Sequence, residues 1–223
     1  LSISEKMRNQ IRGLNQSVKN AEDGISLIQT AEGNMNEIHS ILQRMGELAI
    51  KARNDVNASE DRRSINDEVV QLKAEISAIT TKAEFNGTKL LNGDMSKGKT
   101  LQVGANMGET MAISIKGTSL SNLGLADTSV STGVKASTAI GKIQSAIKNV
   151  SAQRSLLGAI QNRLEYTINN LENYSENLTS AESNIRDTDM ATEMVNYSKN
   201  NILQQAAQSM LSQANQSTQG VLN

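Results

Sequence analysis

Apolar residues recur every seven positions along the first part of the chain. Between them lies a second apolar set, whose distance from the preceding row residue changes from four positions to three about halfway along. An ideal α-helix rotates by about 20° per heptad against a strict seven-residue repeat, so this change keeps one stripe facing the same neighbour. The pattern predicts one long helix over residues 2–53. Its seven-residue row is Met7, Leu14, Ala21, Ile28, Met35, Leu42 and Ala49.

Two more helices are predicted downstream. Ser59, followed by Glu60 and Asp61, is typical of an N-cap with an acidic first turn, and it predicts a helix over 60–82. The most regular repeat in the chain predicts a helix over 137–186. Its seven consecutive heptad positions are Ile143, Val150, Leu157, Leu164, Leu171, Leu178 and Ile185. Long aliphatic seams indicate coiled-coil-like packing, so we expect an elongated antiparallel rod of three helices.

Residues 84–135 differ in character from the helices on either side. Two Asn-Gly pairs, at 86–87 and 92–93, indicate turns within a loop. Apolar and polar residues alternate around Leu101 and again around Met111, which predicts a β-hairpin. The expected fold is therefore mainly α, with a small β-hairpin subregion beside the rod. We expect residues 1–186 to form a rod-like core domain.

A further helix is predicted near the C-terminus, at about 190–214, with Asp187 and Asp189 as its candidate N-terminal caps. It belongs to a separate segment, residues 187–223. Its wide apolar stripe follows the end of the rod, so no partner remains for it within this chain. The residues expected to form this stripe are chiefly Ile202, Leu203, Ala206, Met210 and Leu211.

Composition argues against most enzyme chemistry. The chain has no cysteine, no proline and no tryptophan, few aromatic residues, and a single histidine, His39. No thiol or paired-histidine site can form, and Asp187 with Asp189 fits helix capping better than cation binding. A formal net charge of −1 argues against nucleic-acid binding, and no apolar run approaches the length of a membrane span. We therefore expect no enzyme activity, no metal and no cofactor.

A second apolar row leaves two interpretations open. Ile41 and Leu48 lie off the main stripe, with Arg44 between them on the same side of the helix. The row could meet a neighbouring helix of the same rod. Alternatively it could form a partner surface, because an arginine flanked by aliphatic residues has the composition of an interface hot spot.

Several long motifs resemble one family. "ISEKMRNQIRGLNQSVKNAEDGISLIQTAEGNMNEIHSILQRMGELAIKA" resembles the N-terminal conserved region of bacterial flagellins, and "FNGTKLLNG" the segment after their second helix. "SAQRSLLGAIQNRLEYTINNLENYSENLTSAESNIRDTDMATEM" and "NILQQAAQSMLSQANQSTQGVLN" are similar to their C-terminal region and terminal helix. The resemblance implies a homopolymeric filament subunit for motility, secreted to an extracellular flagellum. It also implies an export chaperone that binds the C-terminal helix.

Compared with the family pattern, the chain lacks the stretch that precedes "LSISEKMR". We therefore expect a truncated chain that does not assemble by itself, since that stretch and the terminal helix together form the inner layer of the filament.

The resemblance also implies a host partner. The stretch "LQRMGELA" is similar to the segment of many flagellins that binds Toll-like receptor 5. Carried over residue by residue, Gln43, Arg44, Glu47 and Leu48 match this motif, and Glu68 matches the acidic residue of the second helix. Gly46 departs from the motif, where an arginine commonly stands. By this resemblance, one surface would face a sister subunit in the filament and the receptor in the free monomer.

Three competing interpretations remain at this point. A hook-filament junction protein shares the terminal pattern, although "QNRLEYTINNL" favours flagellin. A stand-alone coiled-coil scaffold would need neither the 84–135 insert nor an unpartnered helix. An enzyme lacks a usable histidine or cysteine constellation.

Overall fold

The computed structural model describes residues 2–186 and 190–220. The expected caps Asp187 and Asp189 lie outside the described residues. Contacts divide the chain into two compact units, residues 9–177 and residues 1–8 together with 178–223, and each unit is described by itself.

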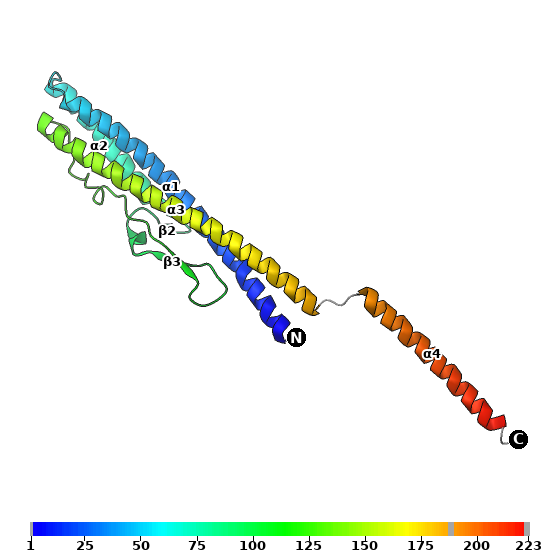
Figure 1. The fold of residues 1–223 in the computed structure, drawn as a ribbon. Coiled ribbons are helices and arrows are strands. Elements are labelled where there is room, and N and C mark those ends of the chain that lie inside the picture. The colour runs from blue at the N-terminus through cyan, green and yellow to red at the C-terminus, as the bar shows by residue number, and fades with distance from the viewer. Residues whose placement is uncertain (1, 187–189, 221–223) are drawn as a thin grey trace. The chain divides into compact units, whose positions relative to one another are not determined.

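The structure contains the expected helices. They are α1 (Ser2–Arg53), α2 (Ser59–Lys82), α3 (Gly133–Arg186) and α4 (Met190–Gly220) (Figure 1). The bounds expected for the first helix are confirmed. Helix α3 begins earlier than expected because Thr132 acts as its N-cap: the Thr132 Oγ1 accepts a hydrogen bond from the Lys135 backbone N–H at 3.3 Å. Helix α4 extends beyond residue 214.

The expected cap of α2 was wrong by one residue. Ser59 is already helical, and Ala58, whose side chain has no acceptor, occupies the N-cap position. The Asp61 Oδ2 instead accepts a hydrogen bond from the Ala58 backbone N–H at 3.1 Å. An acidic residue in the third helical position can reach back in this way, as in one half of a capping box.

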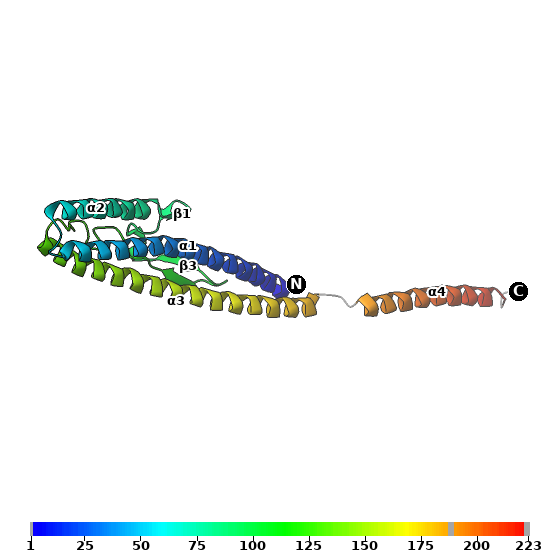
Figure 2. The same cartoon turned by 90° about the horizontal axis from the view of Figure 1, so that it is seen from above.

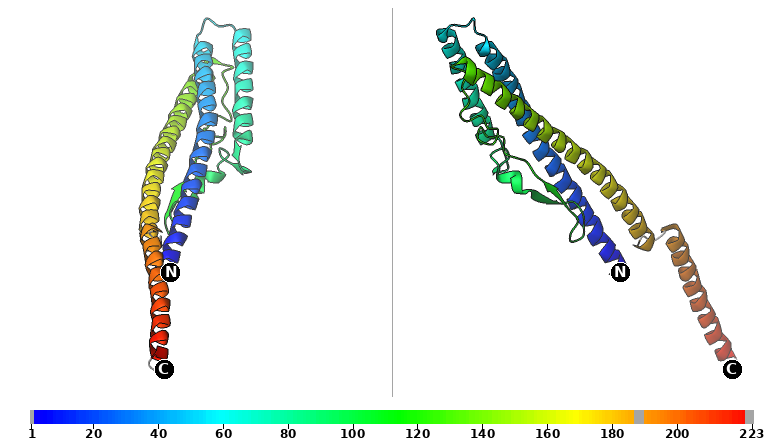
Figure 3. Two further views of the ribbon diagram at one scale, coloured as in Figure 1. Left: turned by 90° about the vertical axis from the view of Figure 1, so that its right-hand side faces the viewer. Right: turned by 60° about the vertical axis from the view of Figure 1, so that its left-hand side comes forward.

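Within the unit of residues 9–177, α1 and α3 run antiparallel, and two different elements cover α1. Helix α2 lies along the C-terminal half of α1, and the β-strand region continues beside the rest (Figures 1 and 3). The seven-residue rows form the seam of this unit. On α1 the row is buried from Leu14 to Ala49, and on α3 it is buried from Ile143 to Leu171.

The α3 row loses its burial in the other unit. Leu178 is half-buried and Ile185 is 53% exposed. The same unit holds a polar cluster centred on Glu182, whose Oε1 accepts a hydrogen bond from Ser4 Oγ at 2.8 Å. Arg8 and Arg186 pair with the same carboxylate at 3.8 and 3.6 Å. Polar contacts therefore hold the start of α1 to the end of α3 where apolar burial is weak.

The segment between α2 and α3 forms two hairpins (Figure 2). Strands β3 (Lys99–Gln102) and β4 (Thr110–Ile113) are the predicted hairpin, with Leu101 opposite Met111. Strands β1 (Glu84–Phe85) and β2 (Thr88–Lys89) pair around Asn86 and Gly87, where only a loop was expected. Both turn residues have positive φ, 47° and 74°, as a tight two-residue hairpin turn requires. A short 3₁₀ helix, η1 (Asp94–Lys97), precedes β3.

Glycines on α1 allow the β3–β4 hairpin to lie directly on the helix. A Cβ atom at Gly24 would stand 2.7 Å from the Leu101 Cδ2, which is closer than carbon atoms approach. The Asn20 Nδ2 also donates a hydrogen bond to the Gln102 carbonyl at 3.1 Å. A larger residue at position 24 would force the Leu101 side chain to shift.

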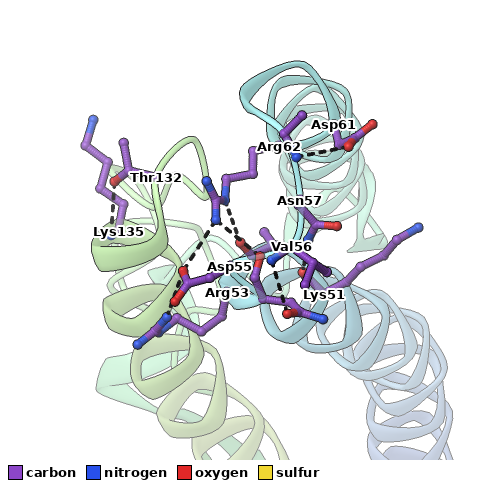
Figure 4. A network of polar contacts seen from close by, with 12 residues as sticks. Lys51, Arg53, Asp55, Val56, Asn57, Asp61, Arg62, Thr132 and Lys135 are labelled. Atoms are coloured by element: carbon purple, nitrogen blue, oxygen red, sulfur yellow. Dashed lines mark hydrogen bonds and ion pairs between the residues drawn. The ribbon is translucent and has the colours of Figure 1, made fainter.

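The turn between α1 and α2 is fastened by one arginine (Figure 4). The Arg62 Nε donates to the Ala52 carbonyl at 3.1 Å, and its Nη2 donates to the Asn54 carbonyl at 3.2 Å. The same guanidinium lies 3.5 Å from the Asp55 carboxylate. Arg62 on α2 thus satisfies carbonyl groups that the C-terminal end of α1 leaves without helical partners.

Replacing Arg62 by alanine should destabilise this turn. Its side chain is only 18% exposed, and hydrogen bonds from a charged donor contribute about 1.5–3 kcal/mol each. After relaxation of the turn we expect the free energy of unfolding to fall by about 1–3 kcal/mol in urea titrations. The exposed neighbour Arg63 provides the control, since Arg63→Ala should change stability by less than about 0.5 kcal/mol. Equal effects of the two substitutions would contradict this role for Arg62.

Candidate interaction surfaces

The first candidate surface lies where α1 meets α2, and an arginine stands at its centre. The Arg44 Nε donates to the Glu68 Oε1 at 3.0 Å, and its Nη2 lies 2.9 Å from the same oxygen. The Arg44 Nη1 bonds the Glu47 Oε2 at 3.1 Å. Hydrogen bonds to Glu68, and then to Glu47, raise the pKa of Arg44 above its ordinary value, so the guanidinium stays charged.

These charges are exposed, which bears on their role. The side chains of Arg44, Glu47 and Glu68 are 53%, 69% and 44% exposed. Ion pairs in such positions contribute little to stability because water and salt screen them. The cluster, which we call the α1–α2 site, therefore presents charged groups at the surface rather than a fold-stabilising bridge. A groove of about 420 Å³ runs beside it between Leu48 and Ile65.

The second apolar row of α1 faces the interior of the rod. Leu48 is only 3% exposed, and Ile41 is partly buried against the core. Of the two interpretations, contact within the same rod is therefore correct for both aliphatic residues. Arg44, Gln43 and Glu47 remain at the surface, so a partner could contact these three directly while Leu48 supports them from below.

His39 lies at the edge of the α1–α2 site. It is half-buried, and its Nε2 lies 3.2 Å from the Gln43 Nε2. Gln43 can donate this hydrogen bond only if the His39 Nε2 carries no proton. The histidine therefore orients the Gln43 amide at the surface.

Gly46 lies beside a second groove, between α1 and α3. A Cβ atom at position 46 would stand 3.7 Å from the Ile143 Cγ2, an ordinary van der Waals distance. The groove has a volume of about 450 Å³ and is lined mainly by Gly46, Ile50, Ile140, Ile143 and Ile147. The missing side chain keeps the groove open.

Replacing Gly46 by alanine should stabilise the chain. Glycine inside a helix costs about 1 kcal/mol relative to alanine, and the new methyl group meets no steric obstacle. We expect the free energy of unfolding to rise by about 1 kcal/mol in urea titrations. In contrast, Gly24→Ala should lose about 1–3 kcal/mol to overpacking, less the same helix gain. A loss of stability in Gly46→Ala would contradict the open space beside that position.

The second candidate surface is the apolar stripe of α4. Its large members Ile202, Leu203, Met210 and Leu211 are 66%, 56%, 71% and 67% exposed, and Ala206 is exposed beside them. Met194 and Val195 extend the stripe toward the start of the helix. A shallow hollow of about 530 Å³ lies between Met194 and Leu203. The stripe that the sequence predicted is therefore present and open in the described part of α4.

The described residues offer no arrangement suited to a metal. Within 2–186 and 190–220, no three His, Asp or Glu side chains gather as ligands. None of the helices in the same ranges has the length and apolar character needed to cross a membrane.

Comparison with known proteins identifies the family of this chain. The model of the bacterial flagellin N-terminal helical region matches residues 1–96, and that of the C-terminal helical region matches residues 140–223. A flagellin of Halalkalibacterium halodurans is 52% identical over the whole of this chain and 82% of its own length. The chain belongs to the bacterial flagellin family. Members of this family are subunits of the flagellar filament.

Other relatives agree with this assignment. A flagellin of Bacillus subtilis is 45% identical over the whole chain and 84% of its own length. A flagellar filament core protein of Treponema phagedenis is 44% identical over the whole chain and 83% of its own length. The crystal structure of Bacillus cereus flagellin matches with a TM-score of 0.63 at 30% identity, covering 79% of this chain and 93% of that one.

A hook-associated protein of Vibrio parahaemolyticus shares the fold, with a TM-score of 0.69 at 13% identity over 81% of this chain and 95% of that one. Identity that low bears on the fold alone.

Two exposed apolar residues, Met107 and Ile50, lie outside every patch that the sequence pattern predicts. Their exposure depends on tertiary structure, and local sequence gave no signal for it.

Proposed function

We propose that the chain is a structural subunit that polymerises with copies of itself into an extracellular flagellar filament for motility. The observation that carries this proposal is the exposed apolar stripe of α4, in a chain of the flagellin family. An apolar face of this size on a solvated helix is unfavourable unless another surface covers it. Lateral contact between the same helices of many copies would bury it and supply the cohesion of a filament.

The fold supports a mechanical role. Helices α1 and α3 have 52 and 54 residues, and no proline interrupts them. Uninterrupted helices packed along an aliphatic seam resist bending, because every backbone hydrogen bond and seam contact must deform together. No chemical step is needed for such a role.

The test is deletion of the gene in the bacterium that produces the protein. Electron microscopy should then show cells without this filament and a loss of swimming, both restored when the gene is returned. The proposal would be overturned if the deletion strain made normal filaments and the product were absent from filaments purified from the unaltered strain.

Export requires that the α4 stripe be covered before assembly. We propose that a cytosolic export chaperone binds α4 through Leu203, Met210 and their neighbours. Calorimetry with the candidate chaperone should show binding to the unaltered chain and a loss of at least tenfold in affinity for Leu203→Asp. An unchanged affinity would place the chaperone elsewhere.

The α1–α2 site is a candidate for recognition by Toll-like receptor 5. Support comes from the exposed Gln43, Arg44 and Glu47 on one helix, with Arg44 bonded to Glu47 and to Glu68 on the next helix. We expect Arg44→Ala to weaken binding to the receptor ectodomain by at least tenfold in surface plasmon resonance, because arginine anchors dominate such interfaces. Glu68→Ala should also weaken it, since the guanidinium loses its principal orienting partner.

A charge exchange separates recognition from folding. The double variant Arg44→Glu with Glu68→Arg keeps an ion pair between α1 and α2 but inverts the charge that a partner meets. Its thermal stability should match that of the unaltered chain, while receptor binding should remain lost. Full binding by the exchanged variant would show that the receptor does not recognise the charges of this surface.

A further inference from the structure

The turn of the β3–β4 hairpin holds an apolar side chain fully in solvent. Met107 is 102% exposed, more than any other large apolar residue in the described chain. Single exposed apolar residues are common on protein surfaces, so the geometry of the turn decides whether Met107 is positioned for a contact. Hydrogen bonds and close packing fix the backbone that carries it.

A network of hydrogen bonds pins the residues on both sides of Met107. The Gln102 Nε2 donates to the Gly104 and Asn106 carbonyls, each at 2.8 Å. The Asn106 backbone N–H and Nδ2 donate to the two oxygens of the Glu109 carboxylate at 2.9 and 3.0 Å. These bonds from Asn106 hold the pKa of Glu109 below its usual value, so the network stays intact at neutral pH.

Close packing fixes the turn further. A Cβ atom at Gly104 would stand 2.0 Å from the Glu109 Oε2, so the backbone there is folded tightly against that side chain. Gly108 has a φ of 94°, which glycine adopts without strain. A Cβ atom at Gly13 of α1 would lie 3.1 Å from the Ala105 Cβ, which shows that the turn rests on the helix. The backbone that carries Met107 is therefore pre-organised, and pre-organisation lowers the entropic cost of binding.

The same rod carries a groove that is large enough for the Met107 projection and apolar over much of its lining, which the polar Gln43, Glu47 and Gln144 complete. The groove between α1 and α3 has a volume of about 450 Å³, ample for one methionine side chain. Buried Ile143 and half-buried Ile140 and Ile147 form its apolar lining, and Ile50, 61% exposed, stands at its rim. Gly46 opens it toward solvent.

Charge does not oppose the match. The Glu109 carboxylate folds back onto Asn106 rather than extending beyond the turn. At the groove, the Glu47 carboxylate is already bonded to Arg44. No unpaired carboxylate of either surface needs to be buried when a methionine enters.

We propose that Met107 of one copy of this chain inserts into the Gly46 groove of the next copy. This deepens the proposed function, on which it rests, by naming one contact between subunits. Methionine suits the contact because its unbranched, polarizable side chain fills irregular apolar gaps.

The position of the two features explains how the contact can repeat. The turn rests on α1 at Gly13, and the stretch of α1 from Gly13 to Gly46 is about 50 Å long at ~1.5 Å per residue. Projection and groove therefore lie at different levels of one rod. A contact between two different surfaces of the same molecule leaves a free projection and a free groove at its ends, so copies can add without closing.

Disulfide trapping tests the pairing, because the chain has no cysteine of its own. Because a disulfide traps even brief contacts, the double variant Met107→Cys with Ile50→Cys should form a ladder of cross-linked multimers on mild oxidation, without a need for stable filaments. The control pairs Met107→Cys with Val70→Cys, which is 48% exposed on α2. We expect the first pair to cross-link at least tenfold faster. Equal cross-linking rates for the two pairs would overturn the proposal. Dimers joined only through position 107, or closed dimers from the first pair, would overturn it as well.

The same variants introduced into the gene separate this inference from the proposed function. Filaments isolated from cells carrying the first pair should yield the ladder on oxidation. Filaments without the ladder would overturn the Met107 contact alone, whereas absence of the product from filaments of the unaltered strain would overturn the proposed function. Gly46→Leu should fill the groove and lower the temperature at which filaments dissociate. Gly33→Leu is the matched control, since a Cβ atom at Gly33 meets nothing within 4 Å.

Discussion

Replacing Leu42 by alanine should lower the free energy of unfolding by about 2–5 kcal/mol. Leu42 is 0% exposed at the centre of the α1 row, between the equally buried Ile38 and Met45. Truncation removes apolar contacts and leaves a cavity that two long, packed helices cannot close by local collapse. Urea denaturation followed by circular dichroism at the helix band measures the change.

Ile50 on the same helix provides the matched control. It is 61% exposed, so Ile50→Ala removes the same kind of aliphatic side chain without creating a cavity in the monomer. We expect its effect to stay within about 0.5 kcal/mol. A loss below about 1 kcal/mol for Leu42→Ala would mean that the seam is not the principal source of stability.

Helix periodicity carried most of the fold prediction. The row from Met7 to Ala49 repeats without a polar interruption, and α1 has the bounds expected from it. The same reasoning missed the start of α3 because the regular row begins only at Ile143. The start is set instead by the Thr132 hydroxyl, a capping interaction that leaves no trace in apolar spacing.

Local turn chemistry was recognised but not fully interpreted. The Asn86-Gly87 pair was read as a turn within a loop, yet it also joins the paired strands β1 and β2. Each strand has only two residues, too few for an alternating pattern to be visible in the sequence. In such cases pairing depends on the packing of the flanking elements, which local sequence does not contain.

The α1–α2 site shows where sequence reasoning reached its limit. Resemblance to flagellins placed Arg44 and Glu68 on one surface, and the structure brings their charged groups to 2.9 Å. Which way Leu48 faces could not be read from spacing, because a second apolar row fits a neighbouring helix and a partner equally well. Only the position of α2 settles it. The exposure of Met107 was likewise beyond prediction, since it follows from hydrogen bonds that form when the turn closes.

Introducing a charge into the α4 stripe should abolish filament assembly under the proposed function. Leu203 is 56% exposed in the monomer, so Leu203→Asp should leave the helical signal and the unfolding curve unchanged. In a filament the carboxylate would have to be buried among apolar side chains without a partner, and an unpaired buried charge costs several kcal/mol. The cost recurs in every subunit and cannot be avoided by rearranging one contact. Sedimentation and electron microscopy of the product from cells should find no filament, with the monomer secreted or, because the same substitution weakens chaperone binding, retained in the cell.

Gln205 gives the matched control for this prediction. It lies two residues further along α4, about 200° around the helix from Leu203, and is exposed. Gln205→Asp adds the same charge to the same helix outside the apolar stripe, so its filaments should form in normal yield. Filaments from Leu203→Asp would show that this stripe stays in solvent after assembly. Loss of filaments from both variants would mean that net charge on α4, rather than burial of its apolar face, controls polymerisation.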